Sequence, residues 1–354
     1  MSLKHNIRNF INKNFKIPRL PFPTELEFEP IQLCNAKCFV CPYSRLQEDK
    51  DYRGKKMPPD KIEFLIKDFG SLIKKNNYTG PTIINPFRYS DPLVCRDLEL
   101  VFNTAKEYNL KVRITTNGVS FNEKYSELLN KNLNQIVHPI SISIIGSTRE
   151  KIKKYMSVNY DITLERLKKV SEKYPKLSKC IVVSLSEVDA SNEEYLEFKE
   201  IEQDFKKLNI KTIKKKKWIN NRIVGDWKIT ANKDKKYNDN FFLQGCKLFK
   251  NKLLRRIEIM VDGSVVLCDD DAEGKLKFGN VFEEGIEKIW NGSLLDYHKK
   301  IYDRMYSSDK DSLICNSCSR AQYNKRQDGI LDSYMEMGNV KFLKQLSNWN
   351  VKWL

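Results

Sequence analysis

The sequence predicts an α/β protein in which a partial barrel of six parallel strands is followed by a small α+β unit. Two observations support this fold class. Between residues 25 and 214, apolar strand-like segments alternate with amphipathic helical segments, which is typical of parallel βαβ units. After Lys214 the alternation gives way to a polar stretch, and then to a hairpin pattern, short helical patterns and a group of cysteines. We therefore expect the second unit to differ in architecture from the first.

The elements of the first unit follow from hydrophobic periodicity and turn signals. ELEFEPIQL (25–33) alternates polar and apolar residues before it becomes apolar, which predicts the first strand. LKVRITTNG (110–118) predicts a strand that ends in an Asn-Gly turn. Functional groups of such folds gather on the loops that follow the strands, so the loop after the first strand is the first candidate site. The other predicted strands are 82–87, 136–146, 180–186 and 210–214, and the predicted helices are 60–74, 97–108, 125–133, 162–174 and 192–208.

The second unit is predicted from a hairpin and two helices. RRIEIMVDGSVVLCDDD (255–271) predicts a β-hairpin with Asp262-Gly263 at its turn. Residues 284–290 and 294–305 predict helices. The basic N-terminus predicts a short amphipathic helix packed on the main domain. The expected organisation is an N-terminal extension (1–24), a barrel (25–214), a linker (215–245), a cluster-binding unit (246–320) and a helical C-terminal segment (321–354).

Composition limits the partners and the compartment. No apolar run approaches the length of a bilayer span, and the N-terminus lacks the apolar core of a signal peptide, so we expect a cytoplasmic protein without a membrane span. The net charge is +17, but the basic residues are scattered. The densest run, 214–217, adjoins no aromatic-rich motif, which favours a solvated basic surface over a specific nucleic-acid groove. An anionic substrate is compatible with this charge.

The cysteine and histidine counts point to thiolate metal chemistry. The chain has nine cysteines and three histidines. Without a signal peptide, a disulfide framework is not expected. The small number of histidines argues against most zinc enzymes, which usually recruit imidazole ligands. Clustered thiolates in a reducing compartment therefore indicate either structural zinc or iron–sulfur clusters.

Three cysteines lie together on the loop after the first predicted strand. Cys34, Cys38 and Cys41 have the spacing C-x3-C-x2-C. Three thiolates can hold three irons of a [4Fe–4S] cluster and leave the fourth iron open to a ligand that is not protein. The alternative is a structural zinc site with a distant fourth ligand, although zinc sites more often use paired C-x2-C segments.

This motif resembles that of the radical S-adenosylmethionine (SAM) superfamily. The resemblance implies a partial (β/α)6 radical SAM barrel in which SAM chelates the open iron of the cluster. It also implies that an electron from the cluster cleaves SAM to methionine and a 5′-deoxyadenosyl radical, which removes a hydrogen atom from a substrate. An external electron donor such as flavodoxin or ferredoxin would supply that electron.

The resemblance extends to residues that would contact SAM. The family usually has an aromatic residue before the third cysteine, close to the adenine, and Val40 occupies that position, with Phe39 one place earlier. A Gly-Gly-Glu-Pro stretch after the second strand of the family holds the methionine amino group. In NPFRYSDPLV, Ser90, Asp91 and Pro92 occupy the corresponding place. This implies that Asp91 positions the SAM amino group, while the alternative is a simple Asp-Pro turn.

Two later strands carry further matches. Thr116 and Asn117, in ITTNG, would lie near the SAM ribose. Ser143, in SISIIGS, matches a serine that contacts the SAM carboxylate or ribose in the family. Ordinary polarity at the end of a strand is the alternative for each of these residues.

A second set of cysteines lies downstream. Cys246, Cys268, Cys315 and Cys318 have the spacing C-x21-C-x46-C-x2-C. Four thiolates close a [4Fe–4S] site or a structural zinc site equally well. GSVVLC, FGNVFEEGIEKIW and the final C-x2-C together resemble the SPASM or twitch extension of radical SAM enzymes. Because no cysteine follows Cys318, the resemblance is to the shorter twitch form, with one auxiliary [4Fe–4S] cluster held entirely by protein.

The remaining reactive residues have weaker signals. Cys180 begins an apolar strand and is expected in the core. Cys95 follows the SAM-facing segment, and a role as hydrogen donor is the functional alternative for it. Residues 269–271 are three consecutive aspartates, which predict a solvated loop, with substrate binding as the alternative. The sequence assigns no catalytic residue.

Three functions remain open. The first is radical SAM oxidation of a small sugar-like or anionic metabolite, because the auxiliary ligand pattern resembles that of twitch-bearing dehydrogenases. The second is a peptide- or protein-modifying radical SAM maturase. Many of these begin with a winged-helix leader-binding module, and only the short stretch before Glu25 precedes the first strand. The third is a zinc-stabilised binding module without catalysis.

Overall fold

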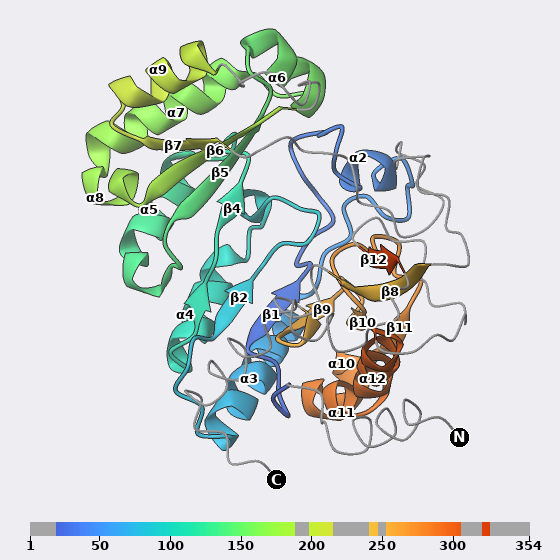
Figure 1. Cartoon of the computed structure of the whole chain (residues 1–354). Helices are drawn as coiled ribbons and strands as arrows, with labels where there is room; N and C mark the ends of the chain where they lie inside the picture. Colours follow the sequence, from blue (N-terminus) through green and yellow to red (C-terminus); the bar gives the residue numbers. More distant parts are fainter. Residues whose placement is uncertain (1–18, 188–197, 215–240, 247–252, 306–320, 326–354) are drawn as a thin grey trace, which may run out of the picture.

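The structure is a computed structural model of the 354-residue chain (Figure 1). It describes residues 19–187, 198–214, 241–246, 253–305 and 321–325. The predicted N-terminal helix and the predicted ligands Cys315 and Cys318 lie outside these residues. In the part of the chain that is described, no helix is long and apolar enough to cross a membrane.

Parallel strands with intervening helices form the predicted partial barrel. β1 (Glu25–Phe28), β2 (Ile83–Asn85) and β3 (Lys111–Val112) lie in one sheet. A second sheet has the order β4-β5-β6-β7. The α/β fold class is therefore confirmed. The strands of the second sheet are β4 (Thr115–Thr116), β5 (Ile140–Ile145), β6 (Ile181–Ser186) and β7 (Lys211–Lys214).

The strand predicted at 110–118 joins the two sheets by changing its partner. Its first part, β3, pairs with β2, and its second part, β4, pairs with β5. At the transition, Arg113 N still donates to Ile84 O (2.8 Å), whereas Ile114 O accepts from Ser141 N (3.0 Å). The neighbouring strands therefore remain connected through backbone hydrogen bonds while the barrel curves, and one predicted strand becomes two short ones.

The predicted hairpin is present, but it does not form a sheet of its own. β9 (Arg256–Ile259) and β10 (Ser264–Val266) are antiparallel, and Gly263 takes the positive φ of 86° that their turn requires. β9 also pairs in parallel with β1, so the six-stranded sheet has the order β11-β10-β9-β1-β2-β3, with β11 at Lys277–Asn280. The sequence pattern did not predict this pairing, which makes the first barrel strand and the downstream hairpin neighbours.

The helices of the downstream region pack on the barrel helix α3 (Pro59–Lys75). The backbone N–H of Ile286 donates to Asp68 of α3 (2.8 Å), and Lys75 pairs with Glu287 (2.7 Å). The start of the described chain packs on the same region, because Trp290 Nε1 donates to Leu20 O (3.0 Å). The helices that contact α3 are α10 (Val281–Glu284) and α11 (Ile286–Asn291), and α12 (Ser293–Met305) packs on α11.

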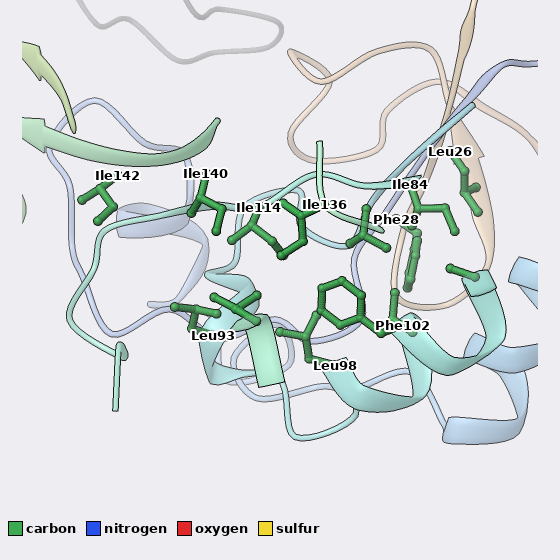
Figure 2. Close-up of a cluster of buried hydrophobic side chains, with 14 of the residues drawn as sticks. Leu26, Phe28, Ile84, Leu93, Leu98, Phe102, Ile114, Ile136, Ile140 and Ile142 are labelled. Atoms are coloured by element: carbon green, nitrogen blue, oxygen red, sulfur yellow. The ribbon is translucent and has the colours of Figure 1, made fainter. Parts of the chain in front are cut away.

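The main core lies between the strands and the covering helices. Leu26 and Phe28 of β1 are fully buried, whereas Glu25 and Glu27 point to the opposite face, as the period of a strand requires. Complete burial of each large apolar side chain contributes roughly 1.5–3 kcal/mol. Figure 2 shows part of this cluster, with Leu26, Phe28, Ile84, Leu93, Leu98, Phe102, Ile114, Ile136, Ile140 and Ile142 labelled.

The helices predicted for the barrel are present, and several short barrel helices were not predicted. Side chains of Asn122, Thr148 and Asn159 accept from the first-turn N–H groups of three helices, which explains where these helices begin. The predicted helices are α3, α4 (Leu98–Glu107), α5 (Glu123–Lys131), α7 (Tyr160–Lys173) and α9 (Lys199–Lys207), and the unpredicted ones are α2 (Tyr43–Leu46), α6 (Arg149–Met156), α8 (Pro175–Lys179) and the 3-10 turns Pro92–Val94 and Leu133–Gln135.

One boundary prediction is wrong. The predicted helical C-terminal segment starts at residue 321, but β12 (Ala321–Lys325) is a strand. It pairs antiparallel with β8 (Phe241–Cys246), whose first residues were assigned to the linker. The pairing of two distant segments is not visible in the local sequence pattern. It places the backbone of Cys246 opposite Ala321.

Candidate cluster and SAM site

The loop that carries Cys34, Cys38 and Cys41 follows the carboxyl end of β1. Within it, Cys41 N donates to Cys38 O (2.9 Å). The loop is attached to the end of α6, because Lys37 N donates to Met156 O (2.9 Å) and Phe39 N donates to Tyr155 O (2.7 Å). The unpredicted helix α6 therefore fixes the position of the cysteine loop.

The three thiols influence one another's ionisation. Burial raises the pKa of Cys34 and of Cys38, and the nearby Asp91 carboxylate and the Cys41 thiol raise both further. Among the described residues, no three His, Cys, Asp or Glu side chains are drawn together into the geometry of a metal site. The donor set nevertheless fits a [4Fe–4S] cluster with one open iron, because it consists of three soft sulfur ligands on one loop. Metal ligation also removes the cost of ionising these buried thiols.

The buried side chain of Asp91 connects the ends of two strands through hydrogen bonds. Its carboxylate accepts from Leu93 N (2.9 Å), Asn117 N (2.9 Å) and the Thr116 hydroxyl (2.8 Å). Burial raises the pKa of Asp91, and these hydrogen bonds oppose that shift. The carboxylate thus joins the segment after β2 to the segment after β4.

Asn117 continues this connection to the cysteine loop. Its Nδ2 donates to Asn35 Oδ1 (2.6 Å) and lies 3.7 Å from Cys34 Sγ. Asn35 in turn donates to Ser120 Oγ (2.7 Å). The structure therefore brings Asp91, Asn117 and Cys34 together. Sequence reasoning missed Asn35, for which the only signal was its place beside Cys34.

The other predicted SAM contacts are placed differently. Val40 is buried in the main core, whereas Phe39 is exposed. Ser90 Oγ is buried and has no hydrogen-bond partner among the described residues. Ser143 is half-buried on β5, one residue beyond Ile142, which pairs with Thr116. The roles of these residues toward SAM stay predictions.

A small aromatic cluster joins the cysteine loop to the loop after Cys268. Its buried members are Tyr43, Tyr52, Tyr89 and Ala272, and Cys34 and Cys41 pack against it. Ala272 is four residues beyond Cys268. The two loops that carry cysteines are therefore in contact through this cluster, although they are far apart in the sequence.

The loop after Cys268 is ordered by its own hydrogen bonds. Asp271 N donates to Cys268 O (3.1 Å), and the Asp271 carboxylate accepts from Lys275 N (2.8 Å) and Leu276 N (2.9 Å). Asp270 and Asp271 are only 4% and 1% exposed. The expectation of a solvated aspartate loop is therefore wrong, because the loop folds inward.

The junction of β1 and β9 carries a buried ion network. Arg256 pairs with Glu25 (3.0 Å), Glu27 and Glu258 (3.4 Å). Burial tends to raise the pKa of Glu25, but the Arg256 guanidinium holds it below its ordinary value. The network follows from the register that places Arg256 beside Glu25 and Glu258 beside Glu27.

The two remaining cysteines lie apart from these loops. Cys95 is buried, burial raises the pKa of its thiol to about 11, and its carbonyl accepts from Tyr125 OH (3.1 Å). Cys180 is half-buried and donates to Lys176 O (3.3 Å). The expectation that Cys180 is a core residue is wrong, because it ends α8 and precedes the buried part of the strand.

Comparisons with known families agree with this arrangement. Residues 28–199 match the model of the radical SAM superfamily, and residues 246–319 match the SPASM iron–sulfur cluster-binding domain. The chain belongs to the radical SAM superfamily and carries a SPASM domain C-terminal to the radical SAM domain. Its cofactors are accordingly SAM, a [4Fe–4S] cluster and auxiliary iron–sulfur clusters.

Solved structures are similar to this chain at low sequence identity. Streptococcus suis SuiB bound to its precursor peptide SuiA is 18% identical, with a TM-score of 0.55, and the match covers 89% of this chain and 74% of SuiB. BtrN in complex with AdoMet and 2-DOIA is 18% identical, with a TM-score of 0.47 and coverage of 83% and 92%. AdoMet-bound anSMEcpe is 15% identical, with a TM-score of 0.48 and coverage of 93% and 96%. No curated protein matches the chain.

Proposed function

We propose that this chain is a radical SAM oxidoreductase that dehydrogenates a small sugar-like or anionic metabolite. The observation that carries the proposal is the contact between the loop after Cys268 and the loop of Cys34, through Ala272 and the buried tyrosines. When bound, SAM and a [4Fe–4S] cluster held by Cys34, Cys38 and Cys41 would supply the means to remove a hydrogen atom from the substrate, and an auxiliary cluster would supply an acceptor for a second electron. Loss of a proton then completes a two-electron oxidation, such as alcohol to ketone.

The chain's own residues divide this work. Cys34, Cys38 and Cys41 would hold the SAM-binding cluster. Asp91 supports the SAM site by fixing the Thr116 hydroxyl and the Asn117 backbone, in addition to its proposed role toward the SAM amino group. The remaining proposed SAM contacts are Val40, Ser90 and Ser143.

The auxiliary site is proposed to hold one closed [4Fe–4S] cluster. Its four ligands would be Cys246, Cys268, Cys315 and Cys318, which is the ligand number that closes such a cluster. Closed ligation leaves no iron for substrate to bind, which supports electron transfer or a structural role.

The second candidate function is modification of a peptide or protein. Its support is that the described fold is shared with SuiB, whose structure contains a precursor peptide. Fold alone does not select a substrate, because one architecture hosts many reactions. The zinc-binding alternative is not carried forward, because both matching family models describe SAM or iron–sulfur proteins.

The proposed partners are a substrate and an electron donor. Reduction of the SAM-binding cluster would come from a flavodoxin- or ferredoxin-type carrier in the cytoplasm. Neither a specific nucleic acid nor a membrane is part of the proposed activity.

The test is a substrate screen with anaerobically purified protein, SAM and a reductant. Polyols, sugar phosphates and short peptides are incubated in separate pools, and 5′-deoxyadenosine and substrate masses are measured together. We expect one polyol or sugar pool to lose two hydrogen atoms per 5′-deoxyadenosine formed. A peptide product, or a small product of unchanged mass, would contradict the proposed oxidation. The protein with Cys34, Cys38 and Cys41 all changed to Ala is the control.

A further inference from the structure

Arg88 is a buried charged residue at the meeting point of the two family regions. It lies on the segment after β2 and is 8% exposed. Its guanidinium donates to the backbone carbonyls of Asp271 and Ala272, the latter at 3.5 Å. Both carbonyls belong to the loop that begins at Cys268, where Asp271 N donates to Cys268 O. Arg88 therefore binds the backbone of the auxiliary ligand loop directly.

The charge of Arg88 is balanced from both regions. Burial disfavours the guanidinium ion, and the carboxylates of Glu29 and Glu258 are among the groups that compensate. Glu29 follows β1, whereas Glu258 lies on β9. Glu29 is fully buried and accepts from Tyr52 OH (2.7 Å) and Gln32 Nε2 (2.8 Å). The two terminal nitrogens of the guanidinium donate to carbonyl oxygens of one loop, whereas its Nε has no hydrogen-bond partner among the described residues.

The same short segment also reaches the SAM-binding loop. Asp91, three residues after Arg88, accepts from Thr116 and Asn117, and the Asn117 amide lies 3.7 Å from Cys34 Sγ. Residues 88–91 thus form a two-ended connector. One end is bound to the Cys268 loop, and the other end is bound to the Cys34 site.

We propose that Arg88 is a positioning residue that fixes the Cys268 loop relative to the SAM-binding cysteine loop. In this role Arg88 does not contact the reacting atoms of SAM or of the substrate. It sets the separation of the two cluster sites, and electron transfer between sites depends on that separation. The proposal deepens the proposed oxidation and rests on it only for the consequence for product formation. The connection that Arg88 makes between the two loops depends on contacts within the chain alone.

The test compares three variants of the full chain with both clusters reconstituted. Arg88→Met keeps much of the side-chain volume but removes the charge and all donors, and Arg88→Lys keeps the charge but loses the fork. Arg96→Met is the matched control, because Arg96 is an exposed arginine eight residues further along. Hydrogen–deuterium exchange is measured for 268–276 and 34–41. Electron paramagnetic resonance of the reduced protein measures the magnetic interaction between the two clusters.

For Arg88→Met we expect exchange in 268–276 to rise roughly tenfold or more, because the loop loses its anchor and opens locally. The magnetic interaction should change, while the iron content stays the same. Arg88→Lys should recover part of both effects, and Arg96→Met should match the parent. If Arg88→Met does not fold, Arg88→Lys decides, because it should still show a measurable part of both changes.

Unchanged exchange and an unchanged magnetic interaction in both Arg88 variants would overturn the proposal. Exchange that rises equally in every segment would also overturn it, because that result indicates general destabilisation. Neither measurement needs SAM or a substrate, because exchange uses the reconstituted protein and electron paramagnetic resonance needs only a reductant. A wild-type protein that never yields an oxidised product therefore contradicts the proposed function and leaves the result on Arg88 intact.

Discussion

The loops of Cys34 and Cys268 follow strands of the same six-stranded sheet, yet they assemble their ligands differently. The three ligands proposed for the first loop all lie within residues 34–41. The proposed auxiliary set consists of Cys246, Cys268, Cys315 and Cys318, so long chain segments must be brought together before that set is complete. A local ligand set can be predicted from spacing alone, whereas a distributed set also depends on the pairing of distant strands.

The largest effect is expected from removing the local ligand set. Changing Cys34, Cys38 and Cys41 together to Ala should reduce 5′-deoxyadenosine formation to background, because no thiolate remains on the loop to hold the cluster. The measurement is anaerobic SAM turnover with a chemical reductant. Cys180→Ala is the control, because Cys180 lies apart from both loops. SAM cleavage that survives in the triple variant would contradict the assignment.

Removing one distributed ligand should separate the two activities. A folded Cys268→Ala variant is expected to cleave SAM but to give no oxidised product, because the second electron has no acceptor. In deuterated solvent the substrate should gain deuterium without net oxidation, as measured by mass spectrometry. Full product yield from this variant would leave the auxiliary cluster a structural role only, and would favour redox-neutral chemistry.

The junction between the two regions should depend on Arg256. Arg256→Met leaves the buried carboxylates of Glu25, Glu27 and Glu258 without their shared partner, so the free energy of unfolding should fall by about 3–5 kcal/mol. Arg255 also pairs with Glu25 but has a side chain that is 40% exposed, so Arg255→Met should cost less than about 1 kcal/mol. Denaturant unfolding of the two variants measures the difference. Equal losses of unfolding free energy in the two variants would show that the buried ion network does not stabilise the β1–β9 pairing.

Within the SAM site, Asp91 is expected to have an intermediate effect. Asp91→Ala removes the acceptor for Thr116 and Asn117, and charge-assisted hydrogen bonds of this kind contribute roughly 1.5–3 kcal/mol. SAM affinity should therefore fall about 10- to 100-fold, as measured by equilibrium binding. Asp91→Glu should be milder because it keeps the carboxylate. If Asp91→Ala binds SAM as tightly as the parent, neither the hydrogen bonds of Asp91 to Thr116 and Asn117 nor a direct contact with SAM contributes to SAM affinity.

The smallest effect concerns acid stability on the auxiliary side. His298 is fully buried beside Trp290, and burial lowers the pKa of its imidazole to about 3. Below its ordinary pKa of 6.5, the unfolded chain binds a proton that the folded chain does not, so stability falls as the pH is lowered toward 3. At pH 5.5 this loss is about 1.4 kcal/mol, one pH unit below the ordinary pKa.

The check is thermal unfolding of wild type and His298→Gln at pH 7.5 and 5.5. Glutamine does not titrate in this range, so the variant should lose less stability on acidification than the wild type does. An equal loss in the two proteins would show that His298 is not the source of the acid sensitivity.

Features that depend on local sequence patterns were predicted better than features that depend on the pairing of distant strands. The alternation in ELEFE predicted the strand that the structure places at Glu25–Phe28, and the cysteine spacing predicted the first ligand loop. The pairing of β9 with β1 and the change of partner after Val112 were not predictable, because each depends on a strand far away in the sequence. The same reason explains Asp270 and Asp271. Consecutive aspartates predict a solvent-exposed loop, but contacts with distant residues such as Arg88 turn this loop inward.

The most direct test of the account is the iron content of anaerobically reconstituted protein, measured for the wild type and for the variant that lacks Cys34, Cys38 and Cys41. Two separate [4Fe–4S] sites predict about eight irons per chain in the wild type and about four in the variant. About twelve irons in the wild type would contradict the single auxiliary cluster. Loss of all iron from the variant would contradict the central claim that the local and the distributed cysteine sets are independent sites.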